Sequence, residues 1–154
     1  MICVRSLRID GSAERALNDL MFKSLSQHAD LGLMIGRLGI GAIFIVFGWM
    51  KLSGGQAAWT QIGHAMVYFG IGFMPNIWGL LAVLSEFLGG ILLVLGFLFR
   101  PAVILILLTM VVAVVTSFRQ HPHDFATYSR PVEMFCILVV FLFVGPGKFS
   151  IDKG

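Results

Sequence analysis

The sequence predicts an all-α integral membrane protein, a bundle of four transmembrane helices. Hydrophobic residues make up 58% of the 154-residue chain and charged residues 12%, against about 45–50% and about 25% in ordinary globular domains. A soluble domain of this length could not bury so much apolar side chain, because its surface-to-volume ratio is too high. The apolar residues also gather in four long stretches, as in membrane spans. Soluble, disordered and secreted disulfide-rich proteins are therefore excluded.

The four apolar stretches lie at residues 31–52, 78–99, 102–118 and 131–147. A helix needs about 20 residues to cross the hydrocarbon core, within a range of about 17–25. Arg100 and Pro101 separate the second stretch from the third, because proline fits the first turn of a helix and disfavours helix in the residue before it. The fourth stretch is short, so three spans plus a half-helix remain the alternative to four.

Two segments outside the spans have amphipathic character. Residues 1–30 carry charges and lack the continuous apolar core of a secretory signal. An apolar face within them is typical of a short helix on the membrane surface, and a solvated or frayed tail is the alternative. This face consists of Leu17, Leu20, Met21 and Leu25. In the first loop, the aromatic-rich residues 56–69 predict a short helix that rests on the outer leaflet or caps the bundle.

Lysine and arginine placement predicts the orientation, because cytoplasmic loops carry the excess of these residues. With the N-terminus inside, the inner segments, including the tail at 148–154, hold seven: Arg5, Arg8, Arg15, Lys23, Arg100, Lys148 and Lys153. The outer segments then hold three: Lys51, Arg119 and Arg130. We therefore expect both termini to be cytoplasmic, in a bacterial inner membrane.

The remaining polar residues give little sign of soluble chemistry. The net charge of +3 is spread along the chain without a basic patch, so no nucleic-acid partner is expected. Two cysteines without a CxxC spacing, and no dinucleotide motif, leave the chain without a redox cofactor of its own. His121 and His123 alternate in one loop and are weak candidates for a metal site, with a solvated loop as the alternative. We predict no metal.

Four charged residues lie inside or at the ends of the predicted spans: Arg37, Lys51, Glu86 and Glu133. A charge at the bilayer centre costs roughly 2.5–3.5 kcal/mol on insertion scales, so such residues usually pair or face a polar cavity. The cluster is thus a candidate site for a quinone head group or a proton route. A static ion pair that fastens two helices is the alternative. Glu133 also suits the first turn of its helix, where the helix dipole favours an acid.

Small residues indicate which helix faces approach each other, because they allow close contact between spans. They are Gly41 and Gly48 in the first span, and Gly79, Ala82 and Gly90 in the second. If these faces pack together, the position of each residue along the helix axis can be counted at 1.5 Å per residue. This count places Glu86 roughly 10 Å from the levels of both Arg37 and Lys51. In the third span, Thr109, Ala113, Thr116 and Ser117 form a mildly polar face. Hydrogen bonds between helices are the expected role of such a face, and a polar path is the alternative.

Three sequence features stand out together. The first span reads GRLGIGAIFIVFGWMKL, the second ends in LGFLFRP, and the chain closes with GPGKFSID at residues 145–152. In this order they resemble the DoxX family of small bacterial inner-membrane proteins. The family is related to the DoxD subunit of thiosulfate:quinone oxidoreductase, and some members are associated with oxidative-stress defence. The resemblance covers about residues 36–152. The N-terminal extension is longer than is usual in the family, which suggests a docking element for a partner.

The resemblance implies a membrane subunit of a quinone-linked oxidoreductase system, with a bound quinone as the expected cofactor and other membrane or peripheral subunits as partners. No catalytic motif identifies the chain as an enzyme by itself. The alternative is a non-enzymatic accessory or scaffolding subunit of a larger membrane complex. A small-solute transporter has less support, because the sequence shows no inverted repeat or matching broken spans.

Overall fold

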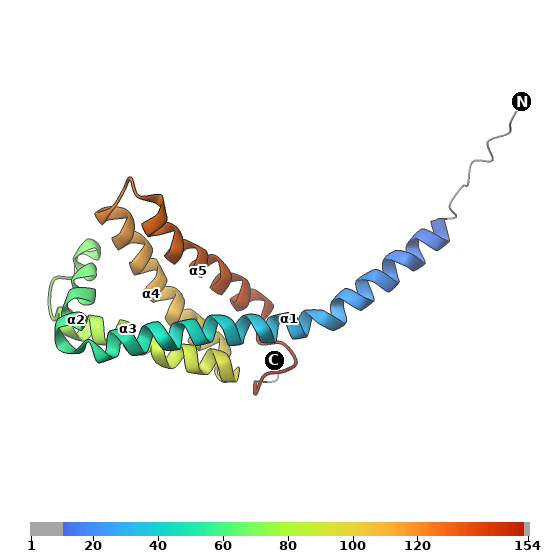
Figure 1. Ribbon diagram of the computed structural model, residues 1–154, viewed down its shortest axis with the longest axis horizontal. Helices are drawn as coiled ribbons and strands as arrows, with labels where there is room; N and C mark the ends of the chain where they lie inside the picture. The colour runs from blue at the N-terminus through green and yellow to red at the C-terminus, as the bar shows by residue number, and fades with distance from the viewer. Residues whose placement is uncertain (1–10, 153–154) are drawn as a thin grey trace, which may run out of the picture.

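The computed structural model describes residues 11–152, and these residues form helices, turns and no strand. The helices follow one another in chain order (Figure 1): α1 (Gly11–Ser53), α2 (Gly55–Gly63), the 3₁₀ helix η1 (His64–Phe69), α3 (Pro75–Leu95), α4 (Phe99–Gln120) and α5 (Phe125–Val144). Within the described residues, four helical segments are long and apolar enough to cross a membrane: His28–Ser53, Pro75–Leu95, Phe99–Gln120 and Phe125–Val144. The predicted all-α membrane fold is confirmed.

The observed spans differ from the predicted ones at their ends. The second span ends at Leu95 rather than residue 99, because Gly96 adopts a left-handed conformation (φ 64°) and donates its N–H to Leu93 O. α4 begins at Phe99 rather than residue 102. α5 begins at Phe125, so Pro131 lies inside the helix instead of starting it. Proline is tolerated inside membrane helices more readily than in soluble ones.

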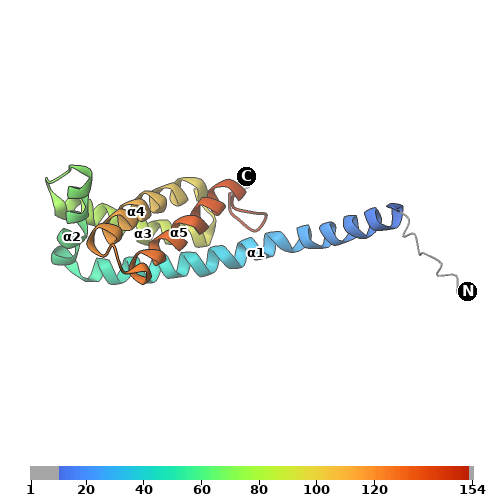
Figure 2. The same ribbon diagram turned by 90° about the horizontal axis from the view of Figure 1, so that it is seen from above.

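The N-terminal part of α1 is continuous with the first span instead of forming a separate short helix. Figures 1 and 2 show α1 extending well beyond the other helices toward the N-terminus. Leu20, on the predicted apolar face, is 67% exposed. The side chains of Leu17, Met21 and Leu25 lie outside the described residues, as do residues 1–10 and 153–154.

Glycines set the distance between α1 and α3. A Cβ added to Gly48 would lie 2.7 Å from Phe87 Cα, and one added to Gly41 would lie 2.9 Å from Gly90 O. Both positions therefore require glycine, because the obstructing atoms belong to the backbone of the other helix. These contacts fix the two helices antiparallel, with Gly48 beside Phe87 and Gly41 beside Gly90.

α2 and η1 form the predicted helical segment of the first loop and lie at one end of the bundle (Figure 1). The backbones of α2 and α3 meet at two glycines: a Cβ on Gly79 would overlap Trp59 O, and a Cβ on Gly63 would overlap Pro75 O. The Trp59 indole N–H donates to Lys51 O at 3.2 Å, which ties α2 to the end of α1.

The apolar core occupies the opposite end of the bundle. Its buried side chains come from all four spanning helices: Phe44, Leu93, Phe99, Val103, Ile106, Met110, Leu138 and Phe141. The Phe99 and Phe141 rings lie 6.1 Å apart. Toward α2 and η1, in contrast, α4 and α5 diverge from α1 and α3 (Figure 1). The bundle is thus tightly packed at one end and splayed at the other.

Candidate functional site

An ion pair joins α1 to α3 at the splayed end of the bundle. Lys51 Nζ donates to Glu86 Oε2 at 2.5 Å. The Glu86 side chain is 6% exposed and the Lys51 side chain 38% exposed, so the carboxylate is buried while the ammonium keeps access to its surroundings. Burial of a carboxylate is tolerated when a cation pairs with it, because the isolated charge would lose its solvation without compensation.

The helix register explains this pairing. Gly48 rests on Phe87, so Lys51, almost one turn further along α1, reaches the position of Glu86. Lys51 also lies in the last turn of its helix, where the helix dipole favours a positive charge. The close approach that the glycines permit therefore determines which cation meets Glu86.

The ion pair lies in the wall of a cavity of about 1030 Å³. Residues from α3, α4, α2 and η1 complete the wall, and most of them are apolar or aromatic. Leu81 and Leu108 line the cavity and are 51% and 60% exposed, so the cavity is open beside these two side chains of α3 and α4. The arrangement is a largely apolar chamber with one charged pair, which is the usual composition of a small-molecule site.

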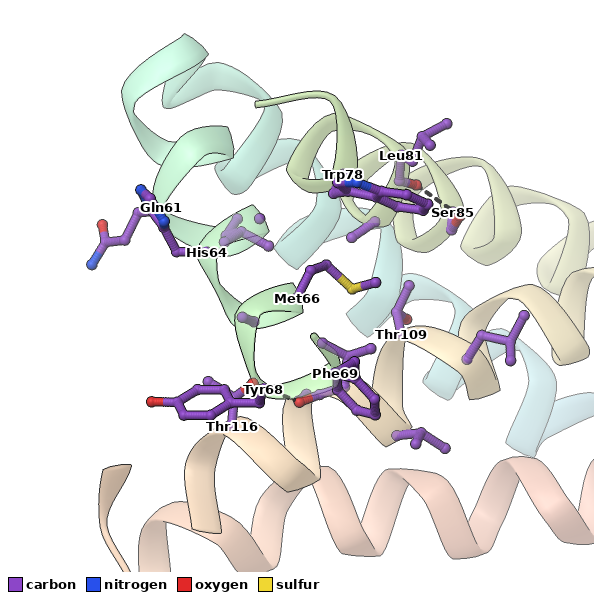
Figure 3. Close-up of a pocket in the computed structure, with 18 of the residues that line it drawn as sticks. Gln61, His64, Met66, Tyr68, Phe69, Trp78, Leu81, Ser85, Thr109 and Thr116 are labelled. Atoms are coloured by element: carbon purple, nitrogen blue, oxygen red, sulfur yellow. Dashed lines mark hydrogen bonds between the residues drawn. The ribbon is translucent and has the colours of Figure 1, made fainter. Parts of the chain in front are cut away.

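η1 covers the cavity from the loop side (Figure 3). Met66 extends from η1 into the space between α3 and α4, and Trp78 lines the α3 side. Polar groups are also present in the wall, at Gln61, His64, Tyr68, Thr109, Thr116 and Gln120. The Thr109 and Thr116 hydroxyls donate to the carbonyls of Ile106 and Val112 of their own helix, both at 2.7 Å. Each hydroxyl oxygen keeps lone pairs that can accept a further hydrogen bond.

The predicted depth of Glu86 midway between Arg37 and Lys51 is wrong, and Arg37 does not contact Glu86. Arg37 lies near the opposite end of α3, beside Gly96, and is 2% exposed. Its Nη2 donates to Phe149 O at 2.6 Å, and its guanidinium carbon lies 5.9 Å from the centre of the Phe99 ring. Its Nε and Nη1 have no hydrogen-bond partner among the described residues. Arg37 thus belongs to the packed end of the bundle.

The segment that follows α5, residues 145–152, folds back over this packed end, and we refer to it as the C-terminal strap. Asp152 N donates to Gly96 O at 2.9 Å, and Asp152 Oδ2 accepts from Phe99 N at 3.0 Å at the start of α4. Lys148 Nζ lies 3.1 Å from Asp30 Oδ2. The GPGKFSID sequence therefore ties the middle of α1 to the end of α3 and the start of α4.

The other candidate residues lie apart from the ion pair. Glu133 is exposed on α5, two turns after its start, and is not in the first turn as predicted. Gly79 faces α2, Ala82 lines the cavity, and Gly90 faces α1, so the small residues of α3 serve three different contacts.

His121 and His123 are exposed in the loop between α4 and α5. No group of three or more His, Cys, Asp or Glu side chains in the described chain is placed to hold a metal ion. The neighbouring Asp124 accepts a hydrogen bond from the Thr127 hydroxyl, and this bond is the main cause of a pKa below the ordinary value of 3.8.

Sequence reasoning missed the cavity and the residues of α2 and η1 that line it. The aromatic residues at 56–69 predicted only an interfacial or capping helix. The polar face at Thr109, Ala113, Thr116 and Ser117 was the available signal, because all four line the cavity.

Known proteins resemble this chain over most of its length. The family model described as DoxX matches residues 32–119. Inner membrane protein YphA of Escherichia coli (strain K12) is 28% identical over 146 residues, which cover 89% of this chain and 99% of that protein. Inner membrane protein YqjF of the same organism is 29% identical over 130 residues, which cover 80% of this chain and 92% of that protein. No solved structure matches the chain significantly.

Proposed function

The chain belongs to the DoxX family of membrane proteins, and from this premise we propose that it is the membrane subunit of a quinone-linked oxidoreductase system. The cavity between α3, α4 and η1 binds the quinone head group in this proposal. The opening beside Leu81 and Leu108 would leave room for the isoprenoid tail to reach the bilayer.

One observation carries the proposal: the wall of a largely apolar cavity of about 1030 Å³ holds one ion pair, between the buried Glu86 and the partly exposed Lys51. A quinone head group combines a flat apolar ring with two carbonyl oxygens that accept hydrogen bonds. The chamber offers the same combination, with apolar walls and the Lys51 ammonium as a donor. Its opening beside Leu81 and Leu108 suits a ligand that arrives from the membrane.

A bound quinone would take up two electrons and two protons on reduction to the quinol. In the proposed site Lys51 Nζ would donate a hydrogen bond to a quinone carbonyl. Glu86 would hold the ammonium in place and would act as the proton-exchanging group beside that carbonyl. The sequence carries no dinucleotide or CxxC motif, so the electrons are supplied by a partner subunit.

The excess of Lys and Arg in the sequence before the first span, between the second and third spans, and after the fourth span supports an orientation with both termini in the cytoplasm. The relatives' location supports a bacterial inner membrane. The cavity then opens toward the outer leaflet.

A quinone-content measurement tests the proposal. The protein is solubilised gently from its native membrane, and the quinone in its lipid extract is quantified per protein by mass spectrometry. Ala113→Phe fills the cavity wall and is expected to lower the quinone content severalfold, whereas Ala42→Phe, on an exposed face of α1 away from the cavity, leaves it unchanged. Equal content in wild type and Ala113→Phe, with both proteins folded, would contradict the proposal.

A non-enzymatic accessory role is the second candidate, and the projecting part of α1 supports it (Figure 2). A helix that extends beyond its own bundle offers a surface for another subunit. Removal of the residues before His28 tests this role: an accessory subunit would lose its partner on purification, and quinone content would not change.

A further inference from the structure

We propose that the packed end of the bundle carries a phosphate-binding site for the head group of an anionic phospholipid. A second cavity, of about 450 Å³, lies at this end. Asp30, Arg100, Val144 and the strap residues 145–148 line it. The site is separate from the Lys51–Glu86 cavity, so it does not depend on the proposed quinone function.

The lining residues place this cavity at the level where lipid head groups lie. Asp30 is near the start of the first span, Arg100 is in the first turn of α4, and Val144 ends α5. Helix ends of membrane spans lie at the boundary between hydrocarbon and head groups. Basic pockets between spans at this boundary are suited to anionic lipid head groups.

The charges in the cavity favour an anion. Arg100 is exposed and has no ion pair or side-chain hydrogen bond with any described residue. Lys148 pairs with Asp30 at 3.1 Å, but its side chain remains 82% exposed. The three groups therefore carry one net positive charge, with Arg100 uncompensated. The nearby carboxylate of Asp152 is engaged with Phe99 N and does not line the cavity.

The strap also presents apolar side chains at the same level. Phe149 and Ile151 are 60% and 62% exposed, although adjacent strap residues make buried contacts with the bundle. Val144 is 56% exposed. Exposed apolar groups beside a cationic cavity match a phospholipid, whose phosphate and acyl chains meet at the same boundary. A free phosphate has no acyl chains, so it would bind the cations without using these exposed apolar side chains.

The test measures lipid binding to the full-length protein in neutral detergent. Phosphatidylglycerol, phosphatidylcholine and inorganic phosphate are titrated separately, and lipid retention is followed by native mass spectrometry together with the melting temperature. We expect phosphatidylglycerol to bind more tightly than phosphatidylcholine. Arg100→Gln should weaken phosphatidylglycerol binding about fivefold, since a cation near an anionic lipid surface is worth about 1 kcal/mol.

Two further variants separate the site from general effects of charge or stability. Arg130→Gln removes an exposed arginine at the other end of α5 and should leave lipid binding unchanged. Asp30→Asn removes the competing carboxylate, frees Lys148 and should strengthen phosphatidylglycerol binding, although it breaks a salt bridge of the fold. Equal binding of the two lipids, or unchanged binding in folded Arg100→Gln, would overturn the proposal. Displacement of phosphatidylglycerol by millimolar inorganic phosphate would assign the site to a soluble anion and overturn the lipid assignment.

Discussion

Lys51 and Glu86 form an ion pair of 2.5 Å that connects the last turn of α1 to the middle of α3, in the wall of the larger cavity. The pair has two consequences. It fastens the two helices where the bundle splays apart, and it places one donor and one acceptor in otherwise apolar surroundings. A pair needed only for fastening could be fully enclosed, whereas the Lys51 side chain is 38% exposed.

The structure predicts energetic coupling between these two residues. Glu86→Gln should lower the free energy of unfolding by about 1 kcal/mol, because the partly exposed Lys51 can be solvated when its partner is lost. Lys51→Met should cost more, about 3 kcal/mol, because it leaves the buried Glu86 carboxylate without its cation. The double variant should lose less than the sum of the two, because residues in contact are non-additive. Unfolding in a denaturing detergent titration measures the cycle. Strict additivity would show that the pair contributes nothing to stability.

Arg37 and Glu86 are predicted to be energetically independent. Arg37 lies beside Gly96, ten residues from Glu86 along α3, which corresponds to about 15 Å. Arg37→Ala should lower stability by about 2–4 kcal/mol, because it leaves a cavity in the packed end and removes the bond to Phe149 O. Combined with Glu86→Gln, the changes should add within about 0.5 kcal/mol. A coupling above 1 kcal/mol would show that the two charges interact.

Gly48 is predicted to tolerate no side chain. Gly48→Ala places a Cβ 2.7 Å from the Phe87 backbone, so α1 and α3 must separate, at a loss of about 1–3 kcal/mol. Gly39→Ala on the same helix is the matched control, because nothing lies within 4 Å of an added Cβ there. The control should be neutral or slightly stabilising, as alanine is the better helix former. Equal melting temperatures for the two variants would refute the packing described for α1 and α3.

Cysteine labelling tests the proposed orientation. In a background without Cys3 and Cys136, Ser53→Cys and Gln120→Cys are expected to react with a membrane-impermeant maleimide in intact cells. Gly154→Cys should react only after the membrane is opened. Ser53 and Gln120 are the last residues of α1 and α4, and Gly154 follows the strap in the sequence, so the reverse pattern would invert the orientation and the assignment of the cavity to the outer leaflet.

Hydropathy was sufficient to predict the four spans, because the length of an apolar stretch reports directly on membrane crossing. The aromatic residues of the first loop predicted its helical segment. The register was not predictable. Glu86 could face either cation until the backbone contacts at Gly48 and Gly90 fixed the relative depth of α1 and α3. The role of GPGKFSID in binding Arg37 was not predictable either. Every residue has a backbone carbonyl, so the sequence does not indicate which one accepts a hydrogen bond from a distant arginine. The cavity lies between α3, α4 and the loop helices α2 and η1, and its shape depends on all the packing contacts together.

The quinone content of the Glu86→Gln variant tests the central claim most directly, provided that melting temperature is measured on the same preparation. The amide keeps the shape of the side chain and an acceptor for Lys51 but removes the charge and the exchangeable proton. We predict a folded protein, with a melting temperature only a few degrees lower, that has lost most of its bound quinone. Wild-type quinone content in a folded Glu86→Gln variant would contradict the assignment of the Lys51–Glu86 cavity as a quinone site.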